Sequence, residues 1–428
     1  MSAARTGRTG RRSAGVAAAV VVGLLLRLGF GLAYWTGKPL THDEREYLSL
    51  AANLVAGRGF TADLPHEPPH PLADRFGRAP LYPLVLAPFV AFDANLRAGH
   101  LPPEVPVPVK AAQSLAGALG IWLVASIARR SLGDRAAVAA AWLAAVYPPL
   151  VWICAYALSE AFYSTLALGV AASLGTVIDG PGNGRRQTGD TARVLGAGLL
   201  VGLAVLARPA TLFLLPLAAA WLAWRHRLAL ALVLLAGAAA TILPWTARNH
   251  LHYGRFVLVA SEGGVTFWTG NHPLAIGEGD LAANPPLKLA NQALRARHPD
   301  LSPEALEPVY YREALGWIAR QPAAWLWLTA RKAFYTVVPI GPSYRLHSAL
   351  YFWASVMSYG LLLPWAAAGA RQVARRAAQP RALWLLAASA VLVCLVFFPQ
   401  ERFRIPVIDP ALIVAASAPL SRFVPDRA

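Results

Sequence analysis

The chain has 428 residues, of which 56% are hydrophobic and only 14% are charged. Apolar runs on the order of twenty residues long recur along it, so the composition predicts a polytopic membrane protein and excludes a soluble fold. The net charge of +17 does not indicate nucleic-acid binding, because the basic residues stand in short clusters between apolar runs and not along one face. We interpret these clusters as topology signals.

The first apolar run, residues 15–35, follows a basic N-terminus and is too long for a signal peptide, so we expect it to remain as a membrane anchor. Positive charge ahead of the run places the N-terminus in the cytoplasm. The run then delivers the acidic turn 41–47 to the outer side of the membrane. The apolar spacing from Tyr47 to Leu54 predicts an interfacial helix directly after this turn.

The next apolar stretch, residues 84–92, is short, and its treatment decides the topology of the central region. If it crossed the membrane, arginine clusters at 129–135, 185–193 and 225–227 would all face outside. If it is re-entrant or interfacial, all three clusters face the cytoplasm, which the positive-inside rule favours. On this second interpretation, we expect spans at residues 107–127, 136–152, 157–178, 194–206, 211–224 and 228–245.

The longest polar region, residues 249–321, then lies outside, with a helix predicted at 303–320. Segment 322–340 carries two cations at its middle, so we expect it at the outer interface or along a cavity. Whether this segment or residues 84–92 span the membrane is left open. Further spans at 347–368, 383–398 and 405–420 complete an all-α fold of about ten transmembrane helices with additional interfacial or re-entrant helices.

Asp43 is the leading candidate for a catalytic group, since a carboxylate at an outward, partly dehydrated mouth acts as a general base or holds a cation. Glu44 beside it belongs to the same candidate site. The competing interpretation is structural, because Asp43 and Glu46 have the spacing of a capping box at the start of the interfacial helix. Capping and catalysis are compatible, since a cap also fixes the side-chain orientation.

Glu160 lies at the outer end of an apolar run, where an acid has a functional role by default. We expect Glu160 and Asp43 to be the paired acids of one cavity. The alternative is that Glu160 is a structural partner for Arg208, which interrupts two short apolar segments at the same level.

Several further cations are expected on the outer face, where topology alone does not demand them. Arginine favours bidentate contacts with phosphate, so the group predicts a phosphate site. The alternative for each residue alone is snorkelling to the interface. The group comprises Arg208, Arg248, Arg331, Lys332, Arg345, Arg402 and Arg404.

No metal ligands are assigned, although histidines occur throughout the outer segments. Residues 66–70 match the HExxH zinc pattern, but two adjacent prolines within it forbid the helix that this pattern requires. His42, or the pair of histidines at 250 and 252, leaves a divalent cation as an open alternative. No other cofactor is expected.

Short motifs recur along the chain in a fixed order and on one predicted topological side: Asp43-Glu44 with Tyr47, Arg78-Ala79-Pro80-Leu81-Tyr82-Pro83, Tyr147-Pro148-Pro149, Ser159-Glu160, Arg208-Pro209, Pro244-Trp245-Thr246-Ala247-Arg248-Asn249, Gly270-Asn271-His272-Pro273 and Arg402-Phe403-Arg404-Ile405-Pro406. Together these motifs resemble the bacterial membrane glycosyltransferases of the C-type fold, in the branch shared by protein O-mannosyltransferases and lipid A aminoarabinose transferases. The resemblance extends over nearly the whole chain.

The resemblance implies an inverting glycosyltransferase that moves a sugar from a polyprenyl-phosphate donor to a glycolipid, polysaccharide or protein acceptor on the outer side of the cytoplasmic membrane. It implies one membrane-embedded domain over residues 1–428, with outer loops at 36–106 and 249–345. Asp43 matches the family's first-loop acid, Glu160 stands in the place of a second acid, and Glu44 completes the catalytic set. The substrate-binding set comprises Tyr47, Arg78, Tyr82, Arg208, Arg248, Asn271, Arg331, Lys332, Arg345, Arg402 and Arg404.

A transporter or flippase of a lipid-linked sugar is the competing hypothesis, since it also needs an amphipathic cavity with acids and bases. It predicts related halves and broken helices near the middle of the membrane. The sequence has no convincing internal repeat, and its polar motifs gather on one face, so the transferase is favoured. The sugar, the acceptor and the lipid length are not determined by the sequence.

Overall fold

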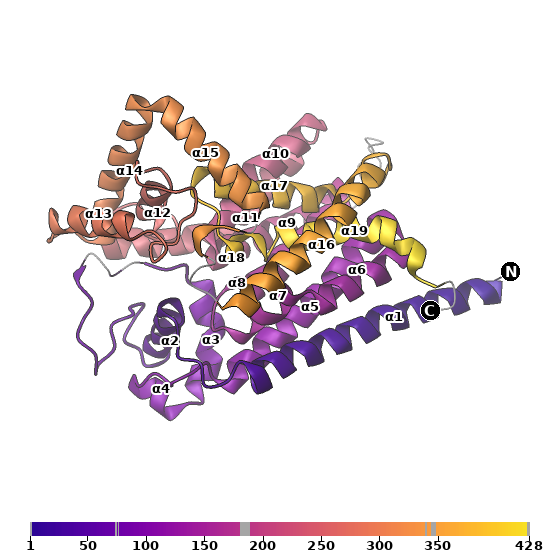
Figure 1. The fold of residues 1–428 in the computed structure, drawn as a ribbon, viewed down its shortest axis with the longest axis horizontal. Helices are drawn as coiled ribbons and strands as arrows, with labels where there is room; N and C mark the ends of the chain where they lie inside the picture. The colour runs from indigo at the N-terminus through magenta and orange to yellow at the C-terminus, as the bar shows by residue number, and fades with distance from the viewer. Residues whose placement is uncertain are drawn as a thin grey trace.

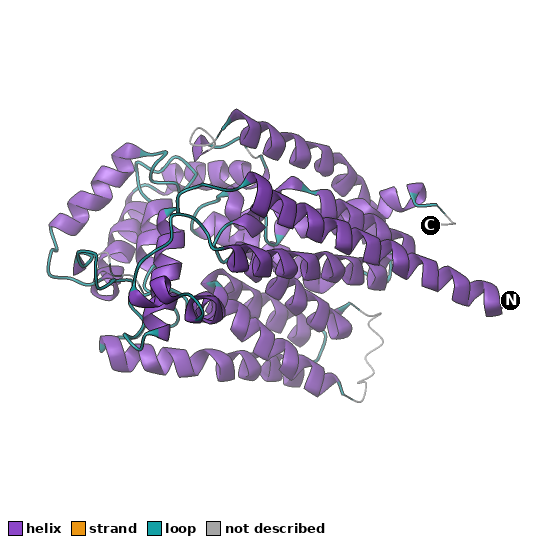
Figure 2. Cartoon of the chain, turned by 90° about the horizontal axis from the view of Figure 1, so that it is seen from below, coloured by secondary structure: helices purple, strands orange, loops and turns teal. Residues whose placement is uncertain are grey.

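The computed structural model describes residues 2–72, 75, 77–179, 189–338, 340–343 and 348–425. Across these ranges the chain folds into helices joined by turns and loops, with no strand (Figure 2). The all-α architecture predicted from the composition is therefore confirmed. Arg345, one of the predicted phosphate ligands, lies outside the described residues.

The N-terminal helix α1 (Ser2–Gly29) continues into a π-helical turn (Phe30–Tyr34) and runs along one edge of the molecule (Figure 1). A small group of helices follows, with α2 (His42–Val55) packed on α3 (Leu81–Ala91) and α4 (Ala94–Ala98). Their buried apolar side chains, Leu48, Tyr82 and Leu86 among them, form a separate small core. At 11 residues, α3 is too short to cross a bilayer.

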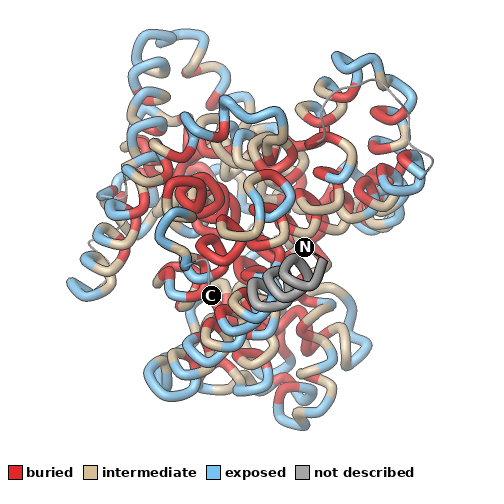
Figure 3. The backbone as a smooth tube through the Cα atoms, turned by 90° about the vertical axis from the view of Figure 1, so that its right-hand side faces the viewer, coloured by how far each residue is buried: buried red, intermediate tan, exposed pale blue. Residues whose placement is uncertain are grey.

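The central bundle contains the main hydrophobic core, and Figure 3 shows its buried segments at the centre and the exposed segments around them. Its helices lie close to the predicted ranges because long apolar runs satisfy their backbone hydrogen bonds internally. They are α5 (Val107–Leu132), α6 (Asp134–Val146), α7 (Pro148–Trp152), α8 (Glu160–Ile178), α9 (Asp190–Ala207), α10 (Leu214–Trp224), α11 (Leu228–Tyr253), α16 (Ala349–Ala374), α17 (Arg381–Val396) and α19 (Ile408–Leu420).

Among the described residues, five helices are long and apolar enough to cross a membrane, namely Ser13–Tyr34, α5, α8, α9 and α11. A sixth span results if α6 and the helical segment Pro148–Ala155, which meet at an angle of 64°, are counted together. The expected total of about ten spans also counts α10, α16, α17 and α19, which lie in the same bundle but are not among these five.

Glycines allow a close helix contact between α9 and α11. A Cβ atom placed on Gly198 would lie 2.5 Å from the Leu234 carbonyl oxygen, and one on Gly202 would lie 2.6 Å from Thr241 Cβ. Small residues four positions apart let two membrane helices approach backbone to backbone. This contact fixes α11 against α9, although α10 lies between them in the chain.

The helices between α11 and α16 form their own layer at one end of the molecule, which is called the outer layer here because of its predicted orientation (Figure 1). Trp268, Leu294 and Tyr310 pack in its core. Its longest helix begins and ends where the sequence predicted, at residues 303 and 320. The layer comprises α12 (Gly263–Gly270), α13 (Pro285–Ala296), α14 (Pro303–Arg320) and α15 (Pro322–Val337).

The opposite end, where both termini lie in Figure 1, gathers the basic connections between helices. Arg130 of α5 forms an ion pair of 3.4 Å with Asp179 at the end of α8, and the Asp179 carbonyl accepts from Arg381. Arg376 donates to the carbonyl of the last α5 residue at 3.3 Å. The described basic clusters are thus segregated from the end that carries α2 and α12 to α15.

Candidate active site

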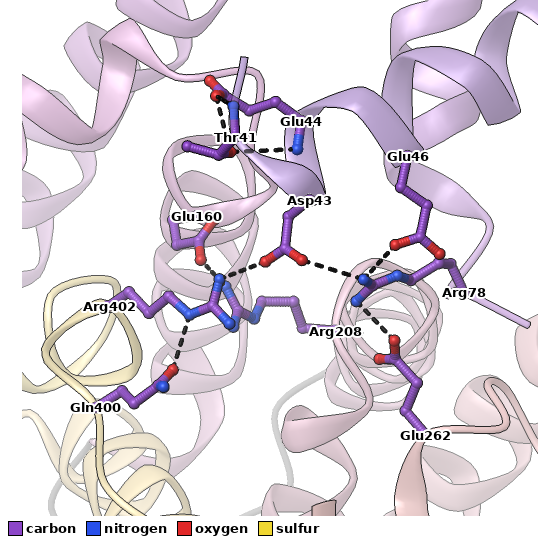
Figure 4. A network of polar contacts seen from close by, with 10 residues as sticks. All are labelled: Thr41, Asp43, Glu44, Glu46, Arg78, Glu160, Arg208, Glu262, Gln400 and Arg402. Atoms are coloured by element: carbon purple, nitrogen blue, oxygen red, sulfur yellow. Dashed lines mark hydrogen bonds and ion pairs between the residues drawn. The ribbon is translucent and has the colours of Figure 1, made fainter. Parts of the chain in front are cut away.

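The acidic turn before α2 is a helix cap built by Thr41 and Glu44. The Glu44 amide donates to Thr41 Oγ1, and Glu44 Oε2 accepts from the Thr41 amide and hydroxyl, each at 2.8 Å. The predicted capping box between Asp43 and Glu46 is therefore wrong. Both of these side chains instead point from the first turns of α2 toward Arg78 (Figure 4).

Glu44 is 2% exposed and its second oxygen accepts the Ala157 amide at 2.9 Å. The carboxylate therefore joins the start of α2 to the segment that leads into α8. Gln113 of α5 holds the same segment by donating to the carbonyls on either side of Ala157. These bonds fix the position of Glu160, the first residue of α8, relative to Asp43.

Charged side chains from six separate segments meet beside the start of α2 (Figure 4). The segments are far apart in the chain, so only the tertiary fold brings their charges together. They contribute Asp43 and Glu46 from α2, Arg78 from the extended segment 77–80, Glu160 from α8, Arg208 from the junction after α9, Glu262 from the start of α12, and Arg402 from the short helix α18 (Glu401–Arg404).

Arg78 is enclosed by three carboxylates. Its Nη1 lies 2.7 Å from Glu262 Oε1, and its Nη2 lies 3.2 Å from Asp43 Oδ1 and also bonds to Glu46. The guanidinium stacks near the Tyr47 ring, and only 16% of the Arg78 side chain is exposed. Because its hydrogen-bonding edge is occupied by acids, Arg78 is suited to orienting Asp43.

Arg402 completes the pairing of Asp43, since its Nη1 lies 2.6 Å from Asp43 Oδ2. Each carboxylate oxygen of Asp43 thus faces its own guanidinium (Figure 4). The Arg402 side chain is 44% exposed and its Nε donates to Gln400. Of the two arginines on Asp43, Arg402 is therefore the one that an anionic ligand is able to reach.

The surroundings shift the pKa values of two acids of the cluster in opposite directions. Burial alone would raise the pKa of Asp43, but Arg402 and Arg78 hold it well below the usual range. Burial raises the pKa of Glu262, and the nearby Glu46 and Asp43 add to this effect against Arg78. Asp43 is therefore ionised at neutral pH and, while it remains paired, a weak proton acceptor.

Glu160 forms an ion pair with Arg208, whose Nη1 lies 2.8 Å from Glu160 Oε1. The Arg208 guanidinium also lies over the rings of Tyr163 and Phe403, at 5.7 and 5.2 Å. The structural alternative for Glu160, as a partner of Arg208, is thus observed. The pair nevertheless faces the same hollow as Asp43, so the two predicted acids share one site.

This hollow is a cavity of about 1230 Å³ that extends from the bundle into the outer layer. Six of the predicted site residues line it: Asp43, Tyr47, Arg78, Glu160, Arg208 and Arg402. One wall is apolar and is formed by Leu212, Phe213, Ala390, Val393 and Phe397. Toward the outer layer the lining becomes polar, with Lys288, Asn291, Gln292, Arg295 and Glu304. The cavity is therefore amphipathic, with the charged cluster between its two parts.

The remaining described candidates do not line this cavity. Glu44 is used by the cap, and the Tyr82 hydroxyl accepts from Gln113 at 2.8 Å. The Arg248 guanidinium lies over the Trp245 ring at 4.8 Å.

Lys332 and Asn271 are likewise committed elsewhere, at the C-terminal end of α17. Lys332 is fully buried and donates to Asn271 Oδ1 at 3.0 Å and to the Leu395 carbonyl at 3.1 Å. Asn271 donates to the Val396 carbonyl at 2.8 Å. The two residues together satisfy carbonyls that the end of a helix leaves without partners. Arg331 beside them packs against the turn at Gly277.

Arg404 is buried next to the bundle core. Its Nε lies 2.9 Å from Asp409 Oδ1, and its guanidinium lies 3.8 Å from the centroid of the Tyr359 ring. The Tyr147 hydroxyl donates to the other oxygen of Asp409 at 3.0 Å. Arg402 and Arg404, two positions apart, therefore point to different surroundings, and only Arg402 lines the cavity.

Two acids of the charged cluster around Arg78 were not predicted as site residues. Glu46 was interpreted only as a capping partner, and Glu262 lies in a polar loop without a recognisable motif. Their ion pairs with Arg78 are their only distinguishing feature, and these depend on contacts across 32 and about 180 residues of chain, respectively. The sequence therefore offered no signal that would have selected them.

Residues 66–70 do not form the helix that a HExxH zinc site needs. His66 stacks on His100, whereas His70 bonds to Asp63 at 2.8 Å. In the part of the chain that the structure describes, no group of three or more histidine, cysteine, aspartate or glutamate residues is arranged to hold a metal ion. Asp43, Glu46 and Glu262 converge instead on the guanidinium of Arg78.

Comparisons with known proteins match these features. Residues 104–248 match the family of dolichyl-phosphate-mannose-protein mannosyltransferases. The structure is similar to the oligosaccharyltransferase AglB of Archaeoglobus fulgidus in complex with an inhibitory peptide and a dolichol-phosphate, at 17% identity and a TM-score of 0.55, covering 96% of this chain and 50% of that one. The oligosaccharyltransferase of the same organism in complex with Zn and sulfate gives 17% identity and a TM-score of 0.54, covering 94% and 48%.

ArnT from Cupriavidus metallidurans bound to undecaprenyl phosphate is also similar, with 18% identity over 97% of this chain and 78% of that one, but the TM-score is only 0.37. No curated protein matches the sequence significantly. The chain spans about half the length of the oligosaccharyltransferase structures that it matches. The predicted C-type glycosyltransferase fold is confirmed, and both the matched family and the matched structures are those of enzymes.

Proposed function

We propose that this membrane protein is an inverting glycosyltransferase that moves a sugar from a polyprenyl-phosphate donor to an acceptor on the outer side of the cytoplasmic membrane. The observation that carries the proposal is the position of Asp43, which is held by two arginines on the wall of a large amphipathic cavity. The match of residues 104–248 to a dolichyl-phosphate-mannose-protein mannosyltransferase family supports the same reaction class.

The donor fits the inner part of the cavity. Phe213, Val393 and Phe397 supply an apolar wall for a polyprenyl chain. Arg208 and Arg402 lie between that wall and the polar outer part, where a phosphate at the end of the chain would meet them. Arginine suits the donor phosphate because its guanidinium makes bidentate contacts with two phosphate oxygens.

Donor binding also explains how a strongly paired Asp43 acts as a base. A phosphate that engages Arg402 competes with the Asp43 carboxylate for the same guanidinium, so the pKa of Asp43 rises from its depressed value. Asp43 then takes a proton more readily while Arg78 keeps its orientation. Binding of the donor in this way makes Asp43 a stronger base.

The reaction is a single displacement. The acceptor oxygen forms a bond to the anomeric carbon as the bond from that carbon to the phosphate oxygen breaks. The acceptor proton passes to Asp43 and then to solvent, while both electrons of the broken bond leave with polyprenyl phosphate. Arg402 and Arg208 stabilise the charge on the leaving phosphate. No nucleotide takes part, because the lipid phosphate is the leaving group.

The proposed orientation places residues 36–106 and 249–345 outside as the two loops of a single domain, residues 1–428. Two features support it: these loops surround the cavity, and the basic connections gather at the opposite end near the termini. The active site then faces away from the cytoplasm, and the protein resides in the inner membrane.

The acceptor in this proposal is a glycolipid, a polysaccharide or a protein. A protein acceptor is favoured by the matched family, whose members are described as protein mannosyltransferases. A glycan acceptor is favoured by the polar end of the cavity, where amide, carboxylate and basic side chains suit a polyhydroxylated molecule. The transporter alternative gains no support from the cavity, since its charged groups lie together beside α2 and α12.

The test is transfer of labelled sugar from a panel of polyprenyl-phosphate sugars in membranes that carry the wild-type protein or Asp43→Asn at matched abundance. We expect transfer by the wild type from one donor and a loss of at least about 100-fold in the variant. Equal transfer by both proteins would reject Asp43 as the base. Donor movement across the membrane without any transfer would instead establish the transporter.

A further inference from the structure

We infer that Arg27, in the first membrane helix, supplies the two hydrogen-bond donors that Pro148 and Pro149 lack, and that it thereby positions the segment leading to Glu160. The donor replacement is independent of the proposed function. Only the effect on transfer rests on it. No sequence motif singled out Arg27, and it takes no part in the cavity.

The register of α6 defines which donors are missing. In an α-helix each N–H bonds to the carbonyl four residues earlier, so the residues at 148 and 149 would serve the carbonyls of Ala144 and Ala145. Proline has no N–H, and both positions are proline. The preceding residue, Tyr147, still makes its regular bond to Leu143, at 3.0 Å. The loss therefore begins at the first proline.

Arg27 meets these two carbonyls. Its Nη2 donates to the Ala144 carbonyl at 3.1 Å and its Nη1 donates to the Ala145 carbonyl at 3.3 Å. Nη1 also donates to the Gly23 carbonyl of its own helix at 2.9 Å. The two guanidinium nitrogens are thus matched to the two orphaned acceptors, one to each.

The surroundings are shaped to admit this side chain. Arg27 is 1% exposed, and a Cβ atom on Gly117 of α5 would lie 2.7 Å from both Arg27 Nε and Cys154 Sγ. Gly117 therefore leaves the space in which the guanidinium and the thiol fit. Cys154 belongs to the turn after α7, so Arg27 contacts the chain on both sides of the proline break.

The hydrogen bonds of Arg27 stabilise the fold because they lie inside a candidate membrane span. Arg27 lies within the candidate span Ser13–Tyr34, and carbonyls at this depth have no water to bond to. A charged side chain inside a span is expensive unless it pairs with other charges or with backbone carbonyls. Arg27 and the broken end of α6 satisfy each other, which accounts for a basic residue at this position.

The proline break sets the direction of the segment that leads to the candidate site. After it the chain turns by 64° into the segment 148–155, which then reaches Ala157 and its bond to Glu44, and finally Glu160. Without donors for the end of α6, the direction of this segment would be less well defined. We therefore assign Arg27 as a positioning residue for Glu160 and, through Glu44, for α2.

The test compares four purified proteins in nanodiscs: the wild type, Arg27→Met, the double variant P148A/P149A, and the variant with all three changes. Alanine restores an N–H at both positions, so Arg27 becomes dispensable for the carbonyls. We expect Arg27→Met to lower the Tm clearly in the wild-type background and little or not at all in the proline-free background. An equal loss of Tm in both backgrounds would overturn the donor replacement.

Removal of a proline can stabilise a helix for unrelated reasons, so a matched control is required. Pro364 lies inside α16 and is exposed on the surface of the bundle. Pro364→Ala should leave the Tm loss caused by Arg27→Met unchanged. A rescue by Pro364→Ala as large as that by the double variant would show general stabilisation and contradict the specific match.

The positioning role has its own readout. At a temperature at which Arg27→Met is fully folded, we expect its kcat for sugar transfer to fall roughly tenfold, because a displaced Glu160 is no longer aligned with Asp43. An unchanged kcat in folded protein would overturn the positioning role while leaving the Tm result intact. If the wild type itself transfers no sugar, the proposed function fails, and the Tm comparison still decides the donor replacement.

Discussion

Asp43 and Arg402 lie 2.6 Å apart although 359 residues separate them in the chain. The start of α2 and the short helix α18 near the other end of the chain therefore meet at one ion pair on the cavity wall. The charge state of the proposed base depends on a guanidinium delivered from the far end of the sequence. A ligand that binds Arg402 consequently changes the chemistry of Asp43 without contacting it.

Arg402→Gln should move the acidic limb of the pH–rate profile to higher pH. Arg402 is the strongest of the groups that depress the pKa of Asp43 against its burial, so its removal lets that pKa rise. The base must be ionised to act, and the variant would lose activity at a higher pH than the wild type as pH falls. The profile of kcat/KM against pH measures the shift, because it reports the free enzyme, in which Arg402 pairs with Asp43. An acidic limb at the same pH as in the wild type would contradict the coupling between these residues.

Glu160 and Arg208 should behave as a pair. Glu160→Gln leaves a buried guanidinium without its partner, and Arg208→Gln leaves a buried carboxylate, so each change alone is costly. We expect the double variant to unfold at a higher temperature than at least one of the single variants. Transfer should stay low in all three, because Arg208 is also proposed to bind the donor phosphate. Additive Tm losses would show that the pair is not coupled.

Glu44→Ala should destabilise the protein by about 1–3 kcal/mol, because it leaves the Ala157 amide without an acceptor in a buried site. Chemical denaturation monitored by fluorescence measures the loss in free energy of unfolding. Asp43→Asn serves as the matched control on the adjacent residue, since Asp43 takes no part in the cap. A larger loss of stability in Asp43→Asn than in Glu44→Ala would contradict the assignment of the cap to Thr41 and Glu44.

Single cysteines should report the proposed orientation. Leu289 in α13 and Arg225 after α10 are both exposed, at the two opposite ends of the topology. The natural Cys154 and Cys394 are buried, so the background of labelling is low. In intact cells a membrane-impermeant maleimide should label Leu289→Cys and should label Arg225→Cys only after permeabilisation. The reverse pattern would place the cavity on the cytoplasmic side.

Chelation of divalent cations should leave transfer largely intact, since Arg78 already supplies positive charge to Asp43, Glu46 and Glu262. Transfer with and without a chelator, at fixed donor concentration, measures this. A complete loss that Mn²⁺ or Zn²⁺ restores would show that a metal ion acts at a position formed only when substrates bind.

The sequence by itself determined the helices. A run of apolar residues forms its hydrogen bonds locally and needs only a bilayer-compatible length, so the ranges of α5, α8 and α11 could be predicted before their packing was known. The helix at 303–320 was predicted to the residue, since proline at its start and the flanking polar segment are local signals. The prediction that Asp43 faces the outer side rests on the same kind of local signal, its place after the first apolar run.

Tertiary structure decided which of the charged residues share a site. Arg402 and Arg404 are two residues apart and chemically alike, yet one reaches Asp43 and the other is buried against Asp409. Lys332 was predicted to bind phosphate, whereas its ammonium donates to the Leu395 carbonyl at the end of α17. Sequence spacing does not settle these outcomes, because the partner of each cation lies on a segment whose position is set by the packing of the whole bundle.

Arg27 shows the same division within one interaction. The two adjacent prolines predict from sequence that α6 must break and that two of its carbonyls lose their hydrogen-bond donors. Which side chain replaces those donors depends on where α1 packs beside α6 and on the space left at Gly117. The local sequence thus determines which carbonyls lack a hydrogen-bond donor. The packing of the segments determines which side chain supplies that donor.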